Sequence, residues 1–162
     1  MFDFAPAPDA TKAQIYDNLA EAAHALTSDE PDLTANMANV AALIWQFLPD
    51  LNWAGFYRMI DGELVLGPFI GKPACIRIPL GSGVCGTAVA QARAQRVDDV
   101  EAFPGHIACD ADSRSELVLP VIANGAVVAV IDLDSPTPAR FDVEDEAGMM
   151  RLAALMGPLF AA

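Results

Sequence analysis

An Asn-Gly pair between two apolar stretches is the feature that most limits what this chain can fold into. Asn124 and Gly125 separate the stretch SELVLPVIA (115–123) from the stretch AVVAVIDLD (126–134). Both stretches are rich in β-branched residues, and Asn-Gly between such runs is the strongest local signal of a β-hairpin. The sequence therefore predicts an antiparallel strand pair over residues 115–134.

The register of this hairpin decides which acidic side chains meet near its open end. A strict two-residue turn places Glu116 opposite Leu133, pointing away from Asp132 and Asp134. A three-residue turn with Gly125 in the left-handed region instead places Glu116 beside Asp132. We predict the second register, because it pairs apolar residues with apolar residues.

Three carboxyl groups would then share one face, since strand side chains alternate with period two. Mutual repulsion among Glu116, Asp132 and Asp134 should hold at least one proton at neutral pH, unless a cation neutralises the group. The alternative is an acidic strand end that simply faces water.

The rest of the chain predicts helices around this sheet and further short strands. Periodicity, caps and turns indicate helices at 11–26, 32–48, 84–93 and 142–157, a hairpin over 51–70 that turns at Asp61-Gly62, and strands at 75–79 and 95–98. We expect one domain over residues 1–162, with a leader at 1–10 and a core at 11–157.

Charge and hydropathy exclude several classes of partner. Nine basic and 22 acidic residues give a net charge of −13, which repels nucleic acid and anionic lipid surfaces. No run reaches the roughly 18 apolar residues of a membrane helix. The N-terminal MFDFAPAPDA lacks the features of a signal peptide, so we expect a cytoplasmic protein.

All three cysteines fall within thirty-five consecutive residues, at Cys75, Cys85 and Cys109. In a reducing compartment an odd cysteine count favours redox chemistry or metal binding over structural disulfides. Cys85 opens a predicted helix, where the terminal N–H groups should favour its thiolate. Cys109 lies seven residues before Glu116, close enough for one loop to bring a thiol near the carboxyls.

Other interpretations of the same residues stay open at this point. The cysteines are compatible with buried inert thiols, or with a zinc site completed by His106, although no C-x-x-C pair is present. Neither His106 nor His24 lies in a recognisable hydrolase context, and the glycines of GSGVCG lack the lysine of a P-loop. Trp53, Phe56 and Tyr57 fit either the core or an aromatic pocket wall.

Four segments carry a resemblance to a known family: WAGFY (53–57), LVLGPFIGKPACIRIPLGSGVCGTA (64–88), DVEAFPGHIACDADSRSELVLPV (99–121) and VIDLDSP (130–136). Together they resemble the free methionine-(R)-sulfoxide reductases, which are built on a GAF fold. The resemblance spans about residues 15–157. It implies an α/β (α+β) domain with a mainly antiparallel sheet of about six strands. The terminal helices would cover one face and active-site loops the other.

The resemblance also implies an oxidoreductase that reduces free L-methionine-(R)-sulfoxide to L-methionine. It assigns attack on sulfur to Cys109, resolution to Cys75, and a possible second resolving role to Cys85. By the same matching, Glu116, Asp132 and Asp134 bind and protonate substrate, while Trp53 and Tyr57 line its pocket.

The implied enzyme has no cofactor, is recycled by thioredoxin and forms a homodimer. Two rival functions share parts of this pattern: a GAF-type sensor of small molecules, and a thiol redox sensor without turnover. Neither sensor needs the carboxyl cluster as a proton donor, so that cluster separates them from an enzyme.

Overall fold

The computed structural model describes residues 4–107 and 110–161 as four α-helices and a six-stranded antiparallel sheet. The elements are α1 (Lys12–Thr27), α2 (Leu33–Phe47), β1 (Trp53–Ile60), β2 (Glu63–Gly71), β3 (Arg77–Pro79), α3 (Gly83–Gln91), β4 (Gln95–Val97), the 3₁₀ turn η1 (Val100–Ala102), β5 (Ser115–Ala123), β6 (Ala126–Ser135), α4 (Val143–Met156) and the 3₁₀ turn η2 (Gly157–Phe160). The strand order is β3-β2-β1-β6-β5-β4.

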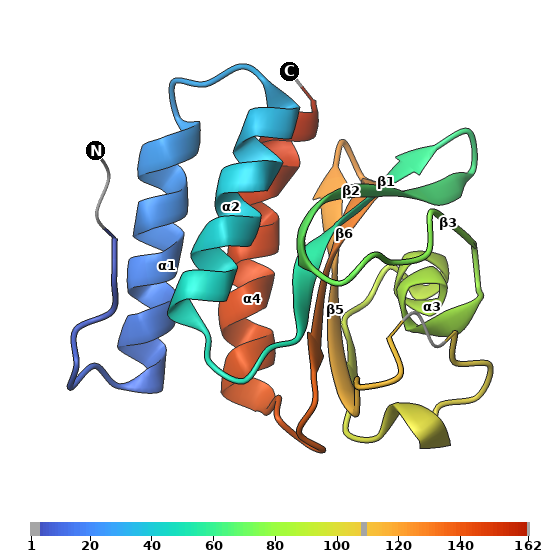
Figure 1. Cartoon of the computed structure of the whole chain (residues 1–162). Coiled ribbons are helices and arrows are strands. Elements are labelled where there is room, and N and C mark those ends of the chain that lie inside the picture. The colour runs from blue at the N-terminus through green and yellow to red at the C-terminus, as the bar shows by residue number, and fades with distance from the viewer. Residues whose placement is uncertain (1–3, 108–109, 162) are drawn as a thin grey trace.

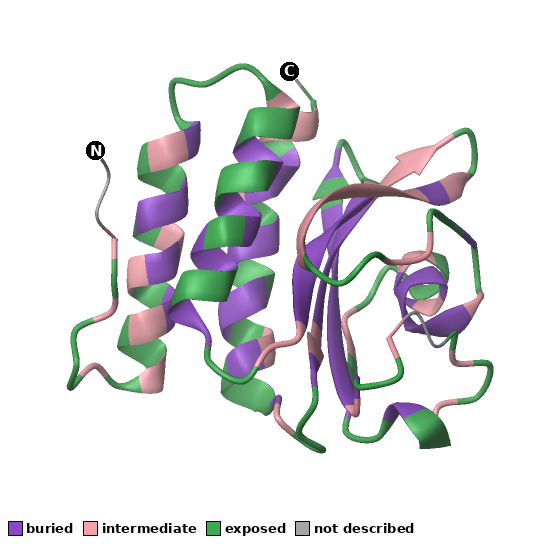
Figure 2. Ribbon diagram, viewed as in Figure 1, coloured by how far each residue is buried: buried purple, intermediate pink, exposed green. Residues whose placement is uncertain are grey.

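The sheet separates two unequal layers. Helices α1, α2 and α4 cover one face, while α3 and the long connections lie on the other (Figure 1). The larger apolar core lies between the three helices and the sheet, and a smaller one lies beneath α3 (Figure 2). The mixed α/β class, the six strands and this division of the two faces confirm the prediction from sequence. No helix in the described part of the chain is long and apolar enough to cross a membrane.

Helix starts follow the capping residues visible in the sequence. Thr11 caps α1 in a capping box with Gln14, and Asp32 caps α2 by accepting the N–H of Ala35. Asp142 caps α4 by accepting the N–H groups of Glu144 and Asp145. The helix boundaries therefore lie within two residues of those predicted.

The β5–β6 hairpin differs from the predicted register. Its turn is the strict two-residue type, with both Asn124 and Gly125 at positive φ. Between Val121 and Ile122 the register then shifts, because β6 contains one extra residue, Val128, opposite that step. The predicted three-residue turn is wrong, but the bulge produces a similar consequence.

A buried carboxylate ties α1 to α4 on the helical side. Asp145 accepts hydrogen bonds from Tyr16 Oη (2.7 Å), Lys12 Nζ (2.7 Å), Arg140 Nη1 (3.3 Å) and the backbone N–H of Asp142 (2.7 Å). The side chain of Asp145 is fully buried. With two cations and a hydroxyl around it, the carboxylate is fully compensated despite its burial.

The contact between α1 and α4 can be tested through the pH dependence of stability at Asp142, the exposed N-cap of α4 that also binds Lys12. Its hydrogen bond from Lys12 lowers the pKa of Asp142 to about 2, with further lowering from the backbone N–H groups of α4. The charged Asp142 carboxylate therefore stabilises the folded protein fully above the pKa that it has in the unfolded chain, about 3.9, and this stabilisation is lost as pH falls toward about 2. Asp142→Asn keeps the cap but loses the charge, so we expect it to cost about 0.3–1 kcal/mol near neutral pH and almost nothing near pH 2. Denaturant unfolding of both proteins across this pH range measures the difference; a cost that stays constant with pH would contradict the assignment.

Candidate active site

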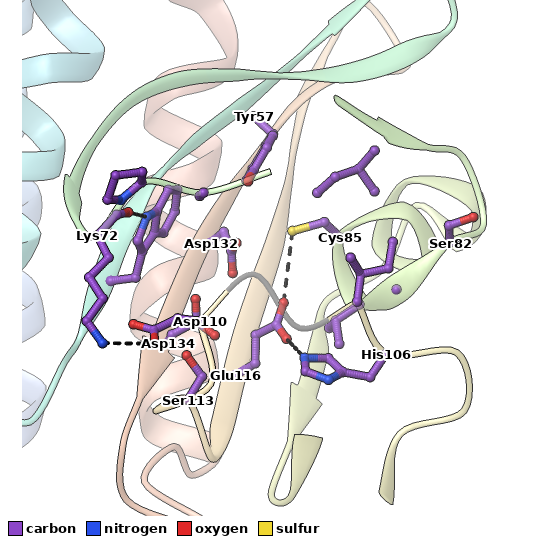
Figure 3. A pocket seen from close by; sticks show the side chains of 17 residues that line it. Tyr57, Lys72, Ser82, Cys85, His106, Asp110, Ser113, Glu116, Asp132 and Asp134 are labelled. Carbon is purple, nitrogen blue, oxygen red and sulfur yellow. Dashed lines mark hydrogen bonds and ion pairs between the residues drawn. The ribbon is translucent and has the colours of Figure 1, made fainter. Parts of the chain in front are cut away.

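A cavity lies on the α3 side of the sheet, between β1, β5, β6, α3 and the loops that cross them (Figure 3). It contains about 530 Å³ of empty space, part of it open to solvent. Its lining combines a thiol, carboxyls, aromatic rings and an imidazole. The residues are Trp53, Tyr57, Lys72, Pro73, Ala74, Ile78, Ser82, Gly83, Val84, Cys85, His106, Ile107, Asp110, Ser113, Glu116, Asp132 and Asp134.

Three carboxyls converge in this cavity, as the sequence predicted. The bulge in β6 sets Glu116 opposite Asp134, rather than beside Asp132 as predicted, and Asp132 lies one pleat further along the same face. Glu116 and Asp132 are each only 6% exposed. The structure therefore rejects the alternative of a solvated acidic strand end for these two residues.

Burial and mutual repulsion keep this cluster partly protonated. Loss of water raises the pKa of Glu116 well above its usual value, and the negative charges of Asp132 and Asp134 raise it further. Burial likewise raises the pKa of Asp134, and it raises the pKa of Asp132 to about 6. At neutral pH the site therefore holds at least one carboxylic acid and at least one carboxylate.

Cys85 lies inside the same cluster. Its Sγ is 4.0 Å from Glu116 Oε1, and its thiol is free and buried (Figure 3). Burial raises the pKa of Cys85 well above its ordinary value, and the charges of Asp132 and Glu116 add to that shift. The expectation that the start of α3 would make Cys85 an acidic thiol is wrong, because desolvation and two carboxyls outweigh the helix end.

The two predicted aromatic residues form one wall of the cavity and also fix a neighbouring segment. Trp53 and Tyr57 stack with ring centroids 5.8 Å apart on the pocket face of β1. Trp53 Nε1 donates to the carbonyl of Lys72 (3.2 Å), and Tyr57 Oη donates to the carbonyl of Cys75 (2.9 Å). The wall therefore anchors the chain segment that leads from β2 to β3.

Cys75 lies in that anchored segment and not in a strand as predicted, since β3 begins only at Arg77. It is disulfide-bonded and packs against the smaller core. Cys109, which was predicted to be the attacking thiol, lies outside the described residues.

Several lining residues were not identified from sequence. Asn52 Nδ2 donates to Asp110 Oδ2 (3.1 Å) and to Ser113 Oγ (3.0 Å), and Lys72 Nζ donates to Asp110 Oδ1 (3.1 Å). The Lys72 bond joins the segment before Cys75 to the loop that follows position 109, and the two Asn52 bonds join the same loop to the residue before β1. For Lys72, Asp110 and Ser113 the only sequence signal was proximity to cysteines, which does not distinguish them from other polar loop residues.

His106 lies at the edge of the carboxyl cluster. Its Nε2 is 3.9 Å from Glu116 Oε2, and burial lowers the pKa of His106. The imidazole is therefore neutral at physiological pH. The zinc arrangement considered from sequence, with all three cysteines and His106, is not the one that the geometry suggests: among the described residues, the ligand atoms that cluster belong to Cys85, Glu116 and Asp132.

Taken together, the cavity offers a carboxylic acid that can donate a proton, carboxylates that can hold a cation, and an aromatic wall for an apolar group. Among the described residues, Cys85 contributes a free thiol to the lining, and the disulfide-bonded Cys75 lies in the neighbouring segment. Its lining also holds two basic side chains, Lys72, which is paired with Asp110, and His106 beside Glu116.

Comparison with known proteins places this architecture in a family. Residues 30–161 match the sequence model of the GAF domain family. The chain is 49% identical over 150 residues to the free methionine-R-sulfoxide reductase of Escherichia coli (strain K12), covering 93% of this chain and 91% of that protein. It is 40% identical over 153 residues to the reductase of the same description from Saccharomyces cerevisiae, covering 90% and 85%.

A solved structure agrees with these sequence relationships. The free methionine-R-sulfoxide reductase of Neisseria meningitidis, determined in complex with its substrate, superposes with a TM-score of 0.92 at 40% identity, covering 98% of this chain and 96% of that one. Both the fold and the sequence similarity extend over nearly the whole chain. The protein therefore belongs to the free methionine-(R)-sulfoxide reductases, a family with the GAF fold.

Proposed function

We propose that this protein reduces free L-methionine-(R)-sulfoxide to L-methionine with its own thiols. The observation that carries the proposal is the convergence of Glu116, Asp132 and Asp134 in one cavity beside an aromatic wall, with Glu116 and Asp132 buried. The family relationship and the substrate complexes of relatives from N. meningitidis and Staphylococcus aureus support it.

The reaction needs a proton donor aimed at the sulfoxide oxygen. A thiolate attacks sulfoxide sulfur readily only if the oxygen is protonated while its bond to sulfur weakens. Glu116 is suited to this role, because burial and neighbouring carboxyls raise its pKa and keep it protonated. Asp132 and Asp134 then supply negative charge to the substrate ammonium group, and Trp53 lies against its methyl group.

The thiol steps follow from the order of the cysteines in the family pattern. The Cys109 thiolate attacks sulfur, the oxygen passes to Cys109 as sulfenic acid, and methionine leaves. The Cys75 thiol then attacks the sulfenic sulfur, water leaves, and a disulfide forms. The disulfide bonding of Cys75 and the anchoring of its segment by Tyr57 support this resolving role, and Cys85 is kept as a second possible resolving thiol.

The external steps complete the cycle. A dithiol of the thioredoxin type reduces the disulfide by exchange, so the protein needs no bound cofactor. Such a cycle requires a reducing compartment, which is why we assign it to the cytoplasm. The homodimer stays a prediction from the family resemblance.

A small-molecule sensor or a redox sensor without turnover is the alternative function. Both would use the GAF fold, and the redox sensor would also use the thiols, but neither would use Glu116 as an acid.

The central experiment measures turnover of free L-methionine-(R)-sulfoxide by the reduced protein with dithiothreitol or thioredoxin. We expect turnover of the free R epimer and little of a peptide-bound sulfoxide, because the carboxyl cluster binds a free ammonium group. We also expect little turnover of the S epimer, because its sulfoxide oxygen would be placed differently relative to Glu116. Cys109→Ser should abolish turnover. A reduced, folded wild-type protein without turnover would refute the enzyme and leave a sensor.

Glu116→Gln tests the proton donor. We expect kcat to fall by about 10²–10⁴, because the amide cannot protonate the sulfoxide oxygen. The melting temperature should not fall, since the change removes a repelled buried carboxyl. The control is Glu144→Gln, at an exposed residue of α4 on the opposite face of the sheet, and it should keep wild-type turnover. Near-normal kcat in Glu116→Gln would assign the acid to another carboxyl.

A further inference from the structure

The cavity contains a buried carboxylate oxygen that has no hydrogen-bond partner. Asp132 is 6% exposed, and its Oδ1 is neither bonded to another group of the described chain nor accessible. Buried polar atoms are nearly always paired, because an unpaired one has lost its water without a replacement. Because Asp132 lines the cavity, its unpaired oxygen indicates a ligand that supplies the missing positive partner.

Two further side chains offer ligand atoms close to the Asp132 carboxylate. The carboxylates of Asp132 and Glu116 and the Sγ of Cys85 offer atoms that all lie within 4.8 Å of one another. The distance from Cys85 Sγ to Glu116 Oε1 is 4.0 Å. In a tetrahedral zinc site, bond lengths of about 2.0–2.3 Å place neighbouring ligand atoms about 3.5 Å apart. Small side-chain rotations would therefore close the cluster around one ion.

The chemistry of the donors selects the ion. A thiolate together with two carboxylates suits Zn²⁺, whereas Mg²⁺ and Ca²⁺ prefer oxygen ligands alone. His106 is the nearest fourth donor, since its Nε2 is 3.9 Å from Glu116 Oε2 (Figure 3). The two carboxylates and the thiolate carry three negative charges, so together they would more than balance the two positive charges of the ion.

We propose that Cys85, Glu116 and Asp132 bind one Zn²⁺, with His106 or solvent in the fourth position, and that this ion blocks the cavity. The ion is an inhibitor and not a cofactor, because it occupies the groups that would receive the substrate. The inhibition depends on the proposed function, whereas the binding does not.

The oxidation state distinguishes this site from a site built on the other thiols. Cys75 is disulfide-bonded in the structure while Cys85 is free. The proposed site is therefore complete in the oxidised protein. A site that required the Cys75 thiol would exist only after reduction.

The test is a titration with Zn²⁺ in competition with a chromophoric chelator, carried out without oxygen on the oxidised and the reduced protein. We expect one ion per chain in both states. Asp132→Asn and Cys85→Ser should each weaken binding by at least about tenfold. Asp112→Asn is the matched control at an exposed carboxyl, with 67% of its side chain accessible, and should bind like the wild type.

Three results would overturn the proposal: no stoichiometric binding, binding confined to the reduced protein, or unchanged affinity in both variants. Co²⁺ provides a measurement that needs no variant to fold, because a bound thiolate gives a charge-transfer band. We expect that band in the oxidised wild-type protein. Its absence at saturating Co²⁺ would exclude Cys85 as a ligand.

Kinetics separate this inference from the proposed function. With turnover established, Zn²⁺ should raise KM for the sulfoxide with little change in kcat, and Asp112→Asn should be inhibited like the wild type. Turnover without Zn²⁺ binding would refute the site and leave the enzyme. Binding without turnover would refute the enzyme and leave the site.

Discussion

The placement of three carboxyls on the face of the sheet that lines the cavity is the constraint on which the rest of the site depends. It follows from a single extra residue in β6, which sets Glu116 opposite Asp134 and leaves Asp132 on the same face. Without that bulge, the strict two-residue turn would place Leu133 opposite Glu116 and separate the acid from both aspartates. The chemistry of the cavity is therefore a consequence of sheet register.

Much of the fold could be predicted because its signals are local. Thr11, Asp32 and Asp142 mark helix starts through side chains that accept backbone N–H groups within three residues, and Asn124-Gly125 marks a turn through its tolerance of positive φ. The strand predicted at 75–79 is shorter than expected for a non-local reason. The Cys75 carbonyl accepts a hydrogen bond from the hydroxyl of Tyr57, which is eighteen residues away in the sequence, and β3 begins only at Arg77.

The site was predictable only in part, and its errors have physical causes. Val127 and Val128 are identical side chains, so no local feature shows which one the sheet leaves unpaired. The acidity expected for Cys85 came from its place at a helix start, but burial beside two carboxyls raises its pKa instead. Burial depends on how α3 packs against β5 and β6. That packing cannot be read from the helix alone.

The need of buried carboxyls for protons or a cation bears both on which substrate the cavity is expected to accept and on its proposed inhibition by zinc. Carboxyls that have lost their water must either hold protons or receive a cation, and the orphaned oxygen of Asp132 indicates that protons alone do not satisfy the cluster. A free amino acid can supply an ammonium group, whereas a peptide-bound residue has none at that position. A divalent metal ion supplies more charge in less space, and the thiol of Cys85 adds a ligand that favours it over an ammonium group. Under the two proposals above, a pocket that binds the ammonium group of a small substrate next to a thiol is also a pocket for zinc, and free zinc would then limit its activity.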